Sequence, residues 1–406
     1  MCGIRILISK IKQRLGMKPR RVKEDSYVLY QNLCDEIFGI GVITIKAAPA
    51  NNVIGTFNYL DDYKEFKENF KKRLKRLKKR FYGTPAYPAL LEQVKQVADP
   101  KNWEGAYAEL AAYDVMWNEY VMTPLELDKT MSATESYAGE MGHKATNEDG
   151  YLPDYELYFD VKILADTVGA ILKGVIEEAI KNSAQTARCD ILPEYPIDDD
   201  DEEYGGANRR LLLNELIVFL KANNSVKKGK KLFRSRVIPR LAYRVLWGGG
   251  INSAIHEYSP YRHAEEMKHL IFKRYTKKIM KNEMFVLVLV KFPWYNNLIT
   301  SFIDADHVFY RSLARRTFCE YLNVPILMNS IVPKFVGKDT VYEVSRHLAG
   351  IVFIDDNIIK EDSYSCNVIL NPNAVITNEV ARDYLMHLVQ NGDKRGLFDD
   401  LRHDNY

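Results

Sequence analysis

The segment MFVLVLVKF at residues 284–292 limits the fold more than any other part of the sequence. Its apolar residues do not alternate with polar ones, so a strand formed there has to be covered on both faces. Strands of that kind belong to α/β proteins, in which helices cover both faces of the sheet. The helical pattern SPYRHAEEMKHLIFKRYTKKIMKNE leads directly into this segment and agrees with that expectation.

Other segments carry the patterns of helices and strands, and together they predict an α/β protein with a mixed sheet. We expect strands at 39–47 (GIGVITIKA), 153–163, 284–292, 350–356 and 367–371. We expect helices at 61–82, 103–121, 164–182, 209–222, 259–281, 306–322 and 378–390. The polar, glycine-containing residues 129–150 predict a loop before the second of these strands.

Three regions are expected from the places where proline, glycine and charge clusters interrupt the chain. The Asp99-Pro100 pair and the prolines before it indicate a boundary near 90–100, so residues 1–95 form a basic, mainly helical N-terminal region. Residues 96–375 form the core, with an insertion at about 183–256 that contains an acidic tract and paired glycines. Residues 376–406 form a C-terminal helix and tail.

Composition argues against two classes of protein. No apolar run approaches the ~18 residues that a membrane-spanning helix needs, so we expect no membrane span. The cysteines lie far apart, without a CxxC pair or a Cys/His cluster, which argues against a structural zinc site. Scattered cysteines are typical of reduced thiols, and we therefore expect a cytoplasmic protein.

Positive charge is concentrated in two stretches, although the net charge of the chain is only +3. Residues 64–81 read KEFKENFKKRLKRLKKRF, and residues 221–240 read KANNSVKKGKKLFRSRVIPR. Clusters of this kind neutralise phosphates in nucleic-acid-binding proteins. Taken alone, each stretch is more typical of a solvated helix face.

The segment PDYELYFDVKI at 153–163 contains charged residues that a buried strand does not need. Asp160 and Lys162 lie two residues apart, so a strand places both side chains on one face, whereas Val161 points to the other face and into the core. Carboxylates are hard oxygen ligands suited to Mg²⁺, and an ammonium group can hold a phosphate as a point charge. These residue types are typical of phosphodiester hydrolysis with a divalent metal.

The order of elements around this segment resembles that of the PD-(D/E)XK nuclease superfamily, whose members share the restriction-endonuclease-like fold. The matching features are a helix with an inward Glu109 in AYAELAAYD, a Pro-Asp pair with Asp154, and a strand that ends in Asp160-x-Lys162 before a further helix. The helix and strand that end in MFVLVLVKF are similar to the next part of the same core.

The resemblance covers roughly residues 100–375. It implies a mixed β-sheet core flanked by helices, to which this chain would add a helical N-terminal extension and an insertion. It also implies that Asp154, Asp160 and Glu109 bind Mg²⁺ or Mn²⁺. Lys162 would hold the attacking water or the scissile phosphate.

The short gap between Pro-Asp and Asp-x-Lys departs from the usual pattern of the family. In one straight strand, Asp154 and Asp160 would lie ~20 Å apart, too far to share a metal. A tight hairpin centred on Leu157 would set Asp154 directly across from Asp160, although the sequence ELY lacks the residues favoured in turns. A straight strand could instead take its second acid from Asp149 in the sequence NEDG. We expect Asp154 from the resemblance and keep Asp149 as the alternative.

The resemblance implies a metal-dependent endonuclease that hydrolyses phosphodiester bonds of DNA. Members of this superfamily serve restriction, anti-phage defence, repair and mobile elements, and this chain is most similar to a restriction or antiviral defence enzyme. Cutting both strands needs two active sites, which suggests a homodimer. Two alternatives stay open: a catalytically inert nucleic-acid-binding or scaffold protein on the same fold, and an RNA nuclease.

Overall fold

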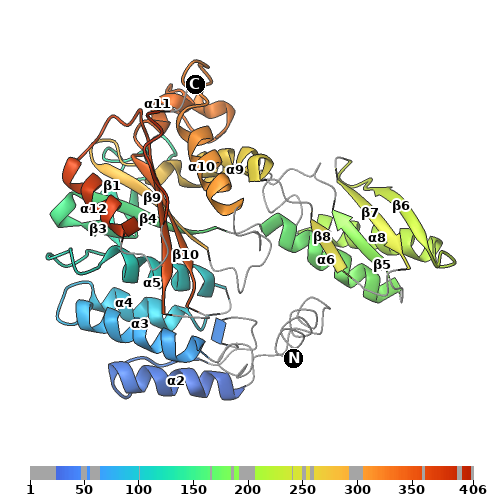
Figure 1. Cartoon of the computed structure of the whole chain (residues 1–406), viewed down its shortest axis with the longest axis horizontal. Helices are drawn as coiled ribbons and strands as arrows, with labels where there is room; N and C mark the ends of the chain where they lie inside the picture. The colour runs from blue at the N-terminus through green and yellow to red at the C-terminus, as the bar shows by residue number, and fades with distance from the viewer. Residues whose placement is uncertain are drawn as a thin grey trace. The chain divides into compact units, whose positions relative to one another are not determined.

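The protein divides into two compact units (Figure 1). The larger unit takes its residues from 20–164, 268–295 and 304–406, and the smaller one takes its described residues from 165–267. A computed structural model describes residues 24–46, 53–54, 65–99, 101–164, 167–183, 187–191, 206–239, 241–248, 253–256, 260–291, 305–358, 362–390 and 396–403.

A six-stranded mixed sheet forms the centre of the larger unit. Its three central strands are parallel to one another, and an antiparallel strand adjoins this group on each side. The protein is therefore a mixed α/β protein, as the sequence predicts. In spatial order the strands are β12 (Phe398–Asp399), β11 (Tyr364–Leu370), β10 (Gly350–Asp356), β9 (Met284–Lys291), β4 (Leu157–Ile163) and β3 (Gly150–Leu152).

Strand β9 is buried along its whole length, which confirms the expectation from its apolar sequence. Val286 and Val288 belong to the hydrophobic core that the N-terminal helices share with one face of the sheet. On the other face, Tyr310 of α10 (Ala305–Phe318) stacks on Phe353 of β10 with 4.1 Å between ring centroids. Helices thus cover both faces, and buried β-branched residues fill the strand between them.

Helices from the N-terminal part of the chain cover the first face of the sheet in successive layers (Figure 1). They belong to the same compact unit as the sheet. The apolar residues of α5 are buried on all sides, and its alanines allow close packing against β4 and β9. The helices are α2 (Glu24–Phe38), α3 (Phe66–Phe81), α4 (Tyr87–Gln96) and α5 (Trp103–Met116).

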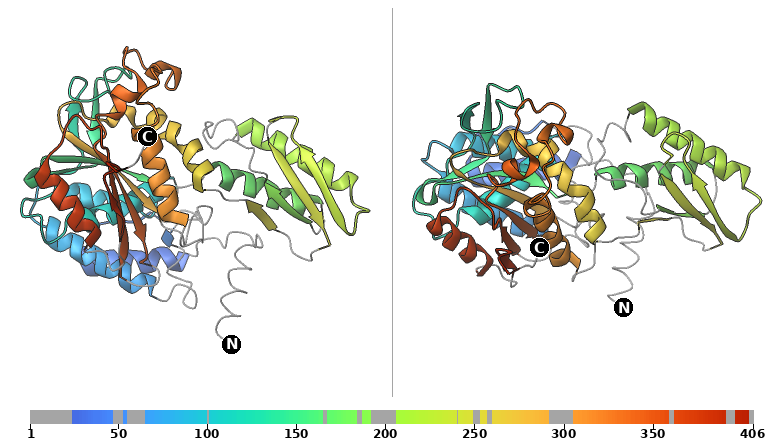
Figure 2. Two further views of the ribbon diagram at one scale, coloured as in Figure 1. Left: turned by 45° about the horizontal axis from the view of Figure 1, so that its top comes forward. Right: turned by 90° about the horizontal axis from the view of Figure 1, so that it is seen from above.

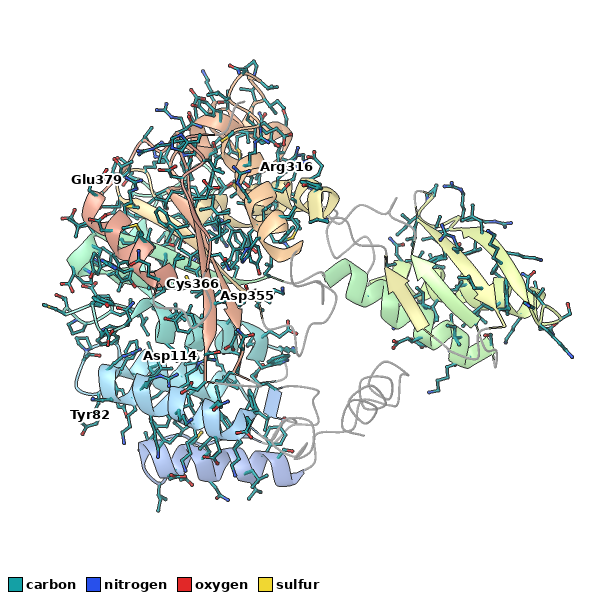
Figure 3. The ribbon with its side chains drawn as sticks, viewed as in Figure 1. Tyr82, Asp114, Arg316, Asp355, Cys366 and Glu379 are labelled. Carbon is teal, nitrogen blue, oxygen red and sulfur yellow. The ribbon has the colours of Figure 1, made fainter. Side chains whose placement is uncertain are left out.

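The basic helix α3 directs arginines toward the interior (Figure 3, in which Asp114 is labelled). Arg73 makes two hydrogen bonds to Asp356 at the end of β10, with N–O distances of 2.8 and 3.1 Å. Arg76 bonds to Asp114 of α5 at 2.6 and 3.0 Å and to Asp362 at 2.7 and 2.9 Å. Bidentate pairs of this kind are strong, and they fasten α3 to α5 and to the sheet.

Residues 39–46 do not form the expected strand. Gly39 and Gly41 adopt positive φ angles of 108° and 76°, which end helix α2 and turn the chain. The side chain of Gln31 then replaces strand pairing, because it donates to the Ile43 carbonyl and accepts from the Ile45 N–H. The β-branched residues of this segment were therefore misleading, and its glycines were the stronger signal.

Residues 129–148 contain a short hairpin where the sequence predicts a loop. Its strands β1 (Lys129–Ser132) and β2 (Ala145–Glu148) pair in antiparallel register, with Lys129 opposite Glu148. Half of the residues in these strands are exposed and most are polar, so the apolar pattern used to recognise strands is weak. Strand β2 leads directly into Asp149 and β3.

The smaller unit contains a four-stranded sheet and two helices. Strands β6 and β7 are antiparallel, as are β7 and β5, whereas β5 and β8 are parallel. In spatial order the strands are β6 (Gly229–Arg234), β7 (Ala242–Trp247), β5 (Ala187–Ile191) and β8 (Ser253–His256). The helices are α6 (Thr167–Ser183) and α8 (Gly206–Ala222).

The remaining elements lie near the sheet of the larger unit or lead into it. They are the 3-10 helices η2 (Pro153–Tyr155), η3 (Thr276–Lys278) and η4 (Met328–Ser330), and the helices α9 (Pro260–Tyr275), α11 (Val341–Ser345) and α12 (Glu379–Gln390). In the part of the chain that the structure describes, no helix combines the length and apolar character that a bilayer crossing requires.

Candidate functional site

A hairpin formed by β3 and β4 brings two carboxylates together. Gly150 pairs with Phe159, and Leu152 pairs with Leu157, so the residues beyond Gly150 and Phe159 are Asp149 and Asp160. Gly150 is needed at this point, because a Cβ atom there would lie 2.1 Å from the Phe159 ring. The hairpin register therefore places Asp149 beside Asp160.

Asp160 is completely buried and lies between two lysine ammonium groups. Its Oδ2 lies 2.6 Å from Nζ of Lys162 on the same strand, and its Oδ1 lies 2.8 Å from Nζ of Lys278 in η3. Burial alone would raise the pKa of Asp160, but the two lysine charges outweigh it and hold the pKa below its usual value. Asp160 is thus a carboxylate with two positive neighbours.

Asp149 contacts the same lysines from the bend that directly precedes β3. Its Oδ2 accepts a hydrogen bond of 2.7 Å from the Val161 N–H and lies 3.4 Å from Lys162 Nζ. Its Oδ1 lies 4.0 Å from Lys278 Nζ. Burial and the negative charge of Asp160 raise the pKa of Asp149 above its usual value. Of the two carboxylates, Asp149 therefore binds a proton more readily than Asp160.

Glu109 reaches this group through Tyr113, one turn further along α5. The Tyr113 hydroxyl is 3.0 Å from Glu109 Oε2 and 3.3 Å from the Asp149 carbonyl oxygen. Burial and the charge of Asp149 raise the pKa of Glu109. Glu109 is half-buried, and Tyr113 holds it at the border of the cluster.

Glu148 is a further carboxylate of this region, and it is completely buried at the end of β2. Neither of its carboxylate oxygens has a hydrogen-bond partner among the residues that the structure describes. Burial raises the pKa of Glu148 to about 9, although the charge of Lys278 opposes this shift. A buried carboxyl group with no partner is costly and is expected where a ligand completes its contacts.

The structure does not bring Asp154 into this cluster. The turn of the hairpin lies at Pro153–Tyr155, not at Leu157, so Asp154 is at the end of the strand pair opposite to Asp160. Its Oδ2 accepts hydrogen bonds from the Met122 and Thr123 N–H groups at 2.7 and 2.8 Å. The Pro-Asp pair therefore forms a turn that fastens the 122–123 loop, and proline and aspartate are favoured in turns.

The outcome for the residues expected from the sequence is mixed. Asp160, Lys162 and the alternative Asp149 lie together, Glu109 adjoins them through Tyr113, and Val161 faces the core as expected. We use the name "carboxylate–lysine cluster" for the residues Glu109, Glu148, Asp149, Asp160, Lys162 and Lys278.

Two members of the cluster were not expected from the sequence. Glu148 directly precedes Asp149 in NEDG. Exposed and buried residues alternate along β2 and Glu148 is at a buried position, so recognition of β2 as a strand would have revealed it. Lys278 follows helix α9 in a run of lysines, and no spacing relates it to the hairpin. Only the parallel pairing of β4 with β9 places η3 near β4.

The cluster contains only oxygen ligands for a metal, since it has no histidine or cysteine. In the described residues, no three carboxylate, histidine or cysteine groups lie together as a finished metal-binding set. Lys162 and Lys278 instead contact Asp160 directly. Carboxylate oxygens suit Mg²⁺ and Mn²⁺, and the unpartnered Glu148 agrees with a ligand at this position.

Comparison of the chain with protein-family models, with curated proteins and with solved structures gave no match.

Proposed function

We propose that this chain is a metal-dependent nuclease that hydrolyses phosphodiester bonds of DNA. One observation carries the proposal: Asp149, which directly precedes β3, meets Asp160 and Lys162 of β4, with 2.6 Å between Lys162 and Asp160 and 3.4 Å between Lys162 and Asp149. Two carboxylates and one ammonium group at this separation are the groups that such a reaction needs.

Asp149 and Asp160 would hold Mg²⁺ or Mn²⁺, together with Glu109 or Glu148. All four supply hard oxygen atoms, and the carboxylate oxygens of Glu148 make no hydrogen bond within the described part of the chain. A divalent metal bound there would activate water and neutralise charge on the leaving oxygen.

The protein groups have separate tasks in this proposal. Lys162 would hold the scissile phosphate or the attacking water by its charge. Burial opposes that charge, but Asp160 and Asp149 outweigh it and raise the pKa of the half-buried ammonium group, which keeps it protonated. Lys278 would balance the negative charge of Asp160 until substrate arrives. Tyr113 acts as a positioning residue, because its hydroxyl orients Glu109 relative to Asp149.

The family resemblance is part of the same proposal, with one change of residue. Asp149 takes the role first expected for Asp154, and Asp160-Val161-Lys162 keeps its role. The support is that Asp149 directly precedes β3 and lies next to Asp160 of the antiparallel strand β4, which in turn pairs with the parallel strand β9. We propose the restriction-endonuclease-like fold for the larger unit on this basis.

The test is cleavage of supercoiled plasmid DNA by the purified full-length protein with Mg²⁺ or Mn²⁺. We expect nicked or linear DNA with metal, none with EDTA, and none with Lys162→Ala or Asp160→Asn. Thermal unfolding of each variant checks that it is folded, because both positions are buried or paired. Cleavage that persists in both variants would assign the activity to another site or to a contaminant.

A matched pair of variants distinguishes the two candidate ligands. Asp149→Asn should abolish cleavage, because this residue contacts Lys162 and lies beside Asp160. Asp154→Asn should keep cleavage, because its partners are the N–H groups of residues 122 and 123. The opposite result would restore Asp154 as the ligand and remove the hairpin cluster from the mechanism.

A second function has a specific observation in its favour. Both oxygens of Asp160 are paired with lysines, which is also the arrangement of a cluster stabilised without any metal. The chain would then bind nucleic acid without cleaving it. Calorimetric titration with Mn²⁺ separates the two: binding that Asp160→Asn abolishes supports the nuclease, and no binding to the wild-type protein overturns it.

A further inference from the structure

The sheet of the smaller unit has one face that is covered by helix α8. Phe219 of α8 packs on Phe233 of β6 and on Trp247 of β7, with 4.7 and 6.3 Å between ring centroids. Tyr243 stacks beside Phe233 at 5.9 Å. The turned view shows the helix and these strands as two layers (Figure 2).

The opposite face of strands β6 and β7 carries basic residues that are exposed. Side chains alternate along a strand, so the residues next to Phe233 and Tyr243 point away from α8. They include Leu232 and Arg244, which are directly opposite each other, and also Lys230 and Arg234. Lys230, Leu232, Arg234 and Arg244 are all exposed. We call these four residues the "β6–β7 basic face".

The sequence around this face contains no acidic residue over a long distance. Residues 216–256 include nine lysines and arginines and no aspartate or glutamate. In the sheet, Asp190 of β5 is in register with Arg244, which is the inner member of the basic face. Lys230 and Arg234 lie on the outer strand β6, one strand further from β5. Exposed lysine and arginine side chains are therefore more frequent on β6 than on β7.

Protection of a sheet edge accounts for only part of this pattern. Strand β6 is an edge strand, and lysines on an edge strand hinder pairing with other chains. Arg244 belongs to the inner strand β7, where no edge needs protection. The absence of acids from residues 216–256 is also more than edge protection requires. A partner with dense negative charge explains the absence of acids from this stretch, and the exposed Arg244 extends the same basic surface onto β7.

We propose that the β6–β7 basic face binds the sugar–phosphate backbone of nucleic acid. A row of cations on a strand can follow a phosphate backbone, and Leu232 between them can contact the sugars. A membrane surface fits less well, because Leu232 is the one exposed apolar side chain on this face of β6 and β7, where Leu246 is half-buried and Ala242 is buried, and bilayer insertion needs a larger apolar area. Contacts of this kind read charge and not bases, so binding is independent of sequence.

This proposal deepens the nuclease proposal by giving the place where substrate backbone is held, and it is tested without cleavage. Fluorescence anisotropy in EDTA would measure binding of the full chain to a labelled short DNA duplex at several salt concentrations. Parallel titrations would use single-stranded DNA and single-stranded RNA. The variant Lys230→Ala/Arg234→Ala/Arg244→Ala removes three cations. For duplex DNA, its affinity should depend less on salt, so that the negative slope of log K against log salt decreases in magnitude by about 2–3.

A matched variant removes three exposed lysines of α3, Lys72→Ala/Lys75→Ala/Lys79→Ala. We expect this variant to bind like the wild-type protein. An equal loss in both variants would mean that surface charge in general binds DNA, and it would overturn the proposal. Unchanged binding of all three nucleic acids by the β6–β7 variant, or no binding by the wild-type protein at low salt, would overturn it too.

Anionic vesicles provide the last arm of the experiment. If the β6–β7 variant loses binding to phosphatidylserine vesicles but keeps its affinity for nucleic acid, the surface is a membrane contact and the proposal is wrong. If it loses nucleic-acid binding, the proposal stands even when plasmid cleavage fails. Failure of the nuclease proposal is therefore distinguishable from failure of this one.

Discussion

Helix α3 and the β6–β7 region are both rich in lysine and arginine, but the fold treats their charges differently. In α3, Arg73 is buried against Asp356, and Arg80 donates a hydrogen bond of 3.0 Å to the Asp114 carbonyl oxygen. In the β6–β7 region, Lys230 and Arg244 are exposed. The arginines of α3 are therefore balanced inside the protein, whereas Lys230 and Arg244 of the β6–β7 region face solvent.

The comparison teaches that a basic stretch cannot be interpreted without its acidic partners. The carboxylates that balance α3 come from α5, from the end of β10 and from Asp362, all far away in the sequence. A pattern of lysine and arginine alone gives no sign of them. Four predictions test this difference between the balanced helix and the exposed face.

The largest effect is expected from Asp356→Ala. Asp356 is completely buried, and it accepts hydrogen bonds from Arg73 and from the Tyr107 hydroxyl at 2.6 Å. Removing one partner of a buried ion pair leaves the other charge without compensation, which costs about 3–5 kcal/mol. Urea unfolding of the variant and the wild-type protein would measure the loss of free energy.

The control for this prediction replaces a charge of α3 that is exposed. Lys72→Ala should change the free energy of unfolding by no more than about 0.5 kcal/mol. The double variant Arg73→Met/Asp356→Leu should recover part of the loss, because it removes both buried charges. A loss below about 1 kcal/mol for Asp356→Ala would contradict the view that α3 is held by balanced charge.

The second effect concerns the pH dependence that Asp114 gives to stability. Burial alone would raise the pKa of Asp114, but Arg76 and the other arginines of α3 outweigh it and lower the pKa. The folded protein therefore binds this proton less readily than the unfolded chain, whose aspartates have a pKa of about 3.9. The stabilisation is present above that pH and is lost as the pH falls through the folded-state pKa.

Asp114→Asn provides the measurement. The variant should be about 1–3 kcal/mol less stable than the wild-type protein near neutral pH, because it loses hydrogen bonds between charged groups. Unfolding in urea at a series of pH values should show this difference shrinking in acid. A difference that stays constant down to the lowest pH at which the protein folds would refute the role of Asp114.

The comparison also explains which parts of the fold the sequence predicts well. Strand β9 was expected at nearly the observed residues, and helix α5 was expected from its observed start, although it ends at Met116 and not at residue 121. Both patterns arise from local burial. The strand predicted at 39–47 was wrong, because two glycines with positive φ end a helix there. Polar strands β1 and β2 were missed, because they lack an apolar pattern.

The site divides in the same way. Asp160 and Lys162 share a face of one strand, so their proximity follows from a period of two residues. The partner acid depended on where the hairpin turns, and the turn at Pro153–Tyr155 selects Asp149 over Asp154. The position of Lys278 beside Asp160 depends on the pairing of β4 with β9, which are distant in sequence, and no local pattern contains that information.

The third prediction concerns Lys278. Its charge is paired with Asp160, like the charges of the α3 arginines, but a metal ion bound to Asp160 would replace that pairing. Lys278→Met leaves Lys162 as a neighbour of Asp160 and removes one positive charge from the cluster. We expect severalfold tighter binding of Mn²⁺, measured by calorimetric titration, because less positive charge repels the ion. The unfolding temperature without metal should fall slightly.

Lys281→Met is the matched control for this variant, because Lys281 pairs with Glu140, which is not in the carboxylate–lysine cluster. It should leave the affinity for Mn²⁺ unchanged. Weaker binding of Mn²⁺ by Lys278→Met would show that this lysine supports the site and does not compete with a cation.

The smallest effect is expected for the stability of the β6–β7 variant. Lys230, Arg234 and Arg244 are exposed, so their replacement by alanine should change the free energy of unfolding by about 0.5 kcal/mol or less per position. Between about 50 and 200 mM salt, the wild-type protein should gain slightly more stability than the variant, because salt screens repulsion among these cations. Urea unfolding at both salt concentrations tests this. A large loss of stability in the variant would mean that these residues hold the smaller unit together, as the arginines of α3 do for the larger one. The difference between the two basic regions would then disappear.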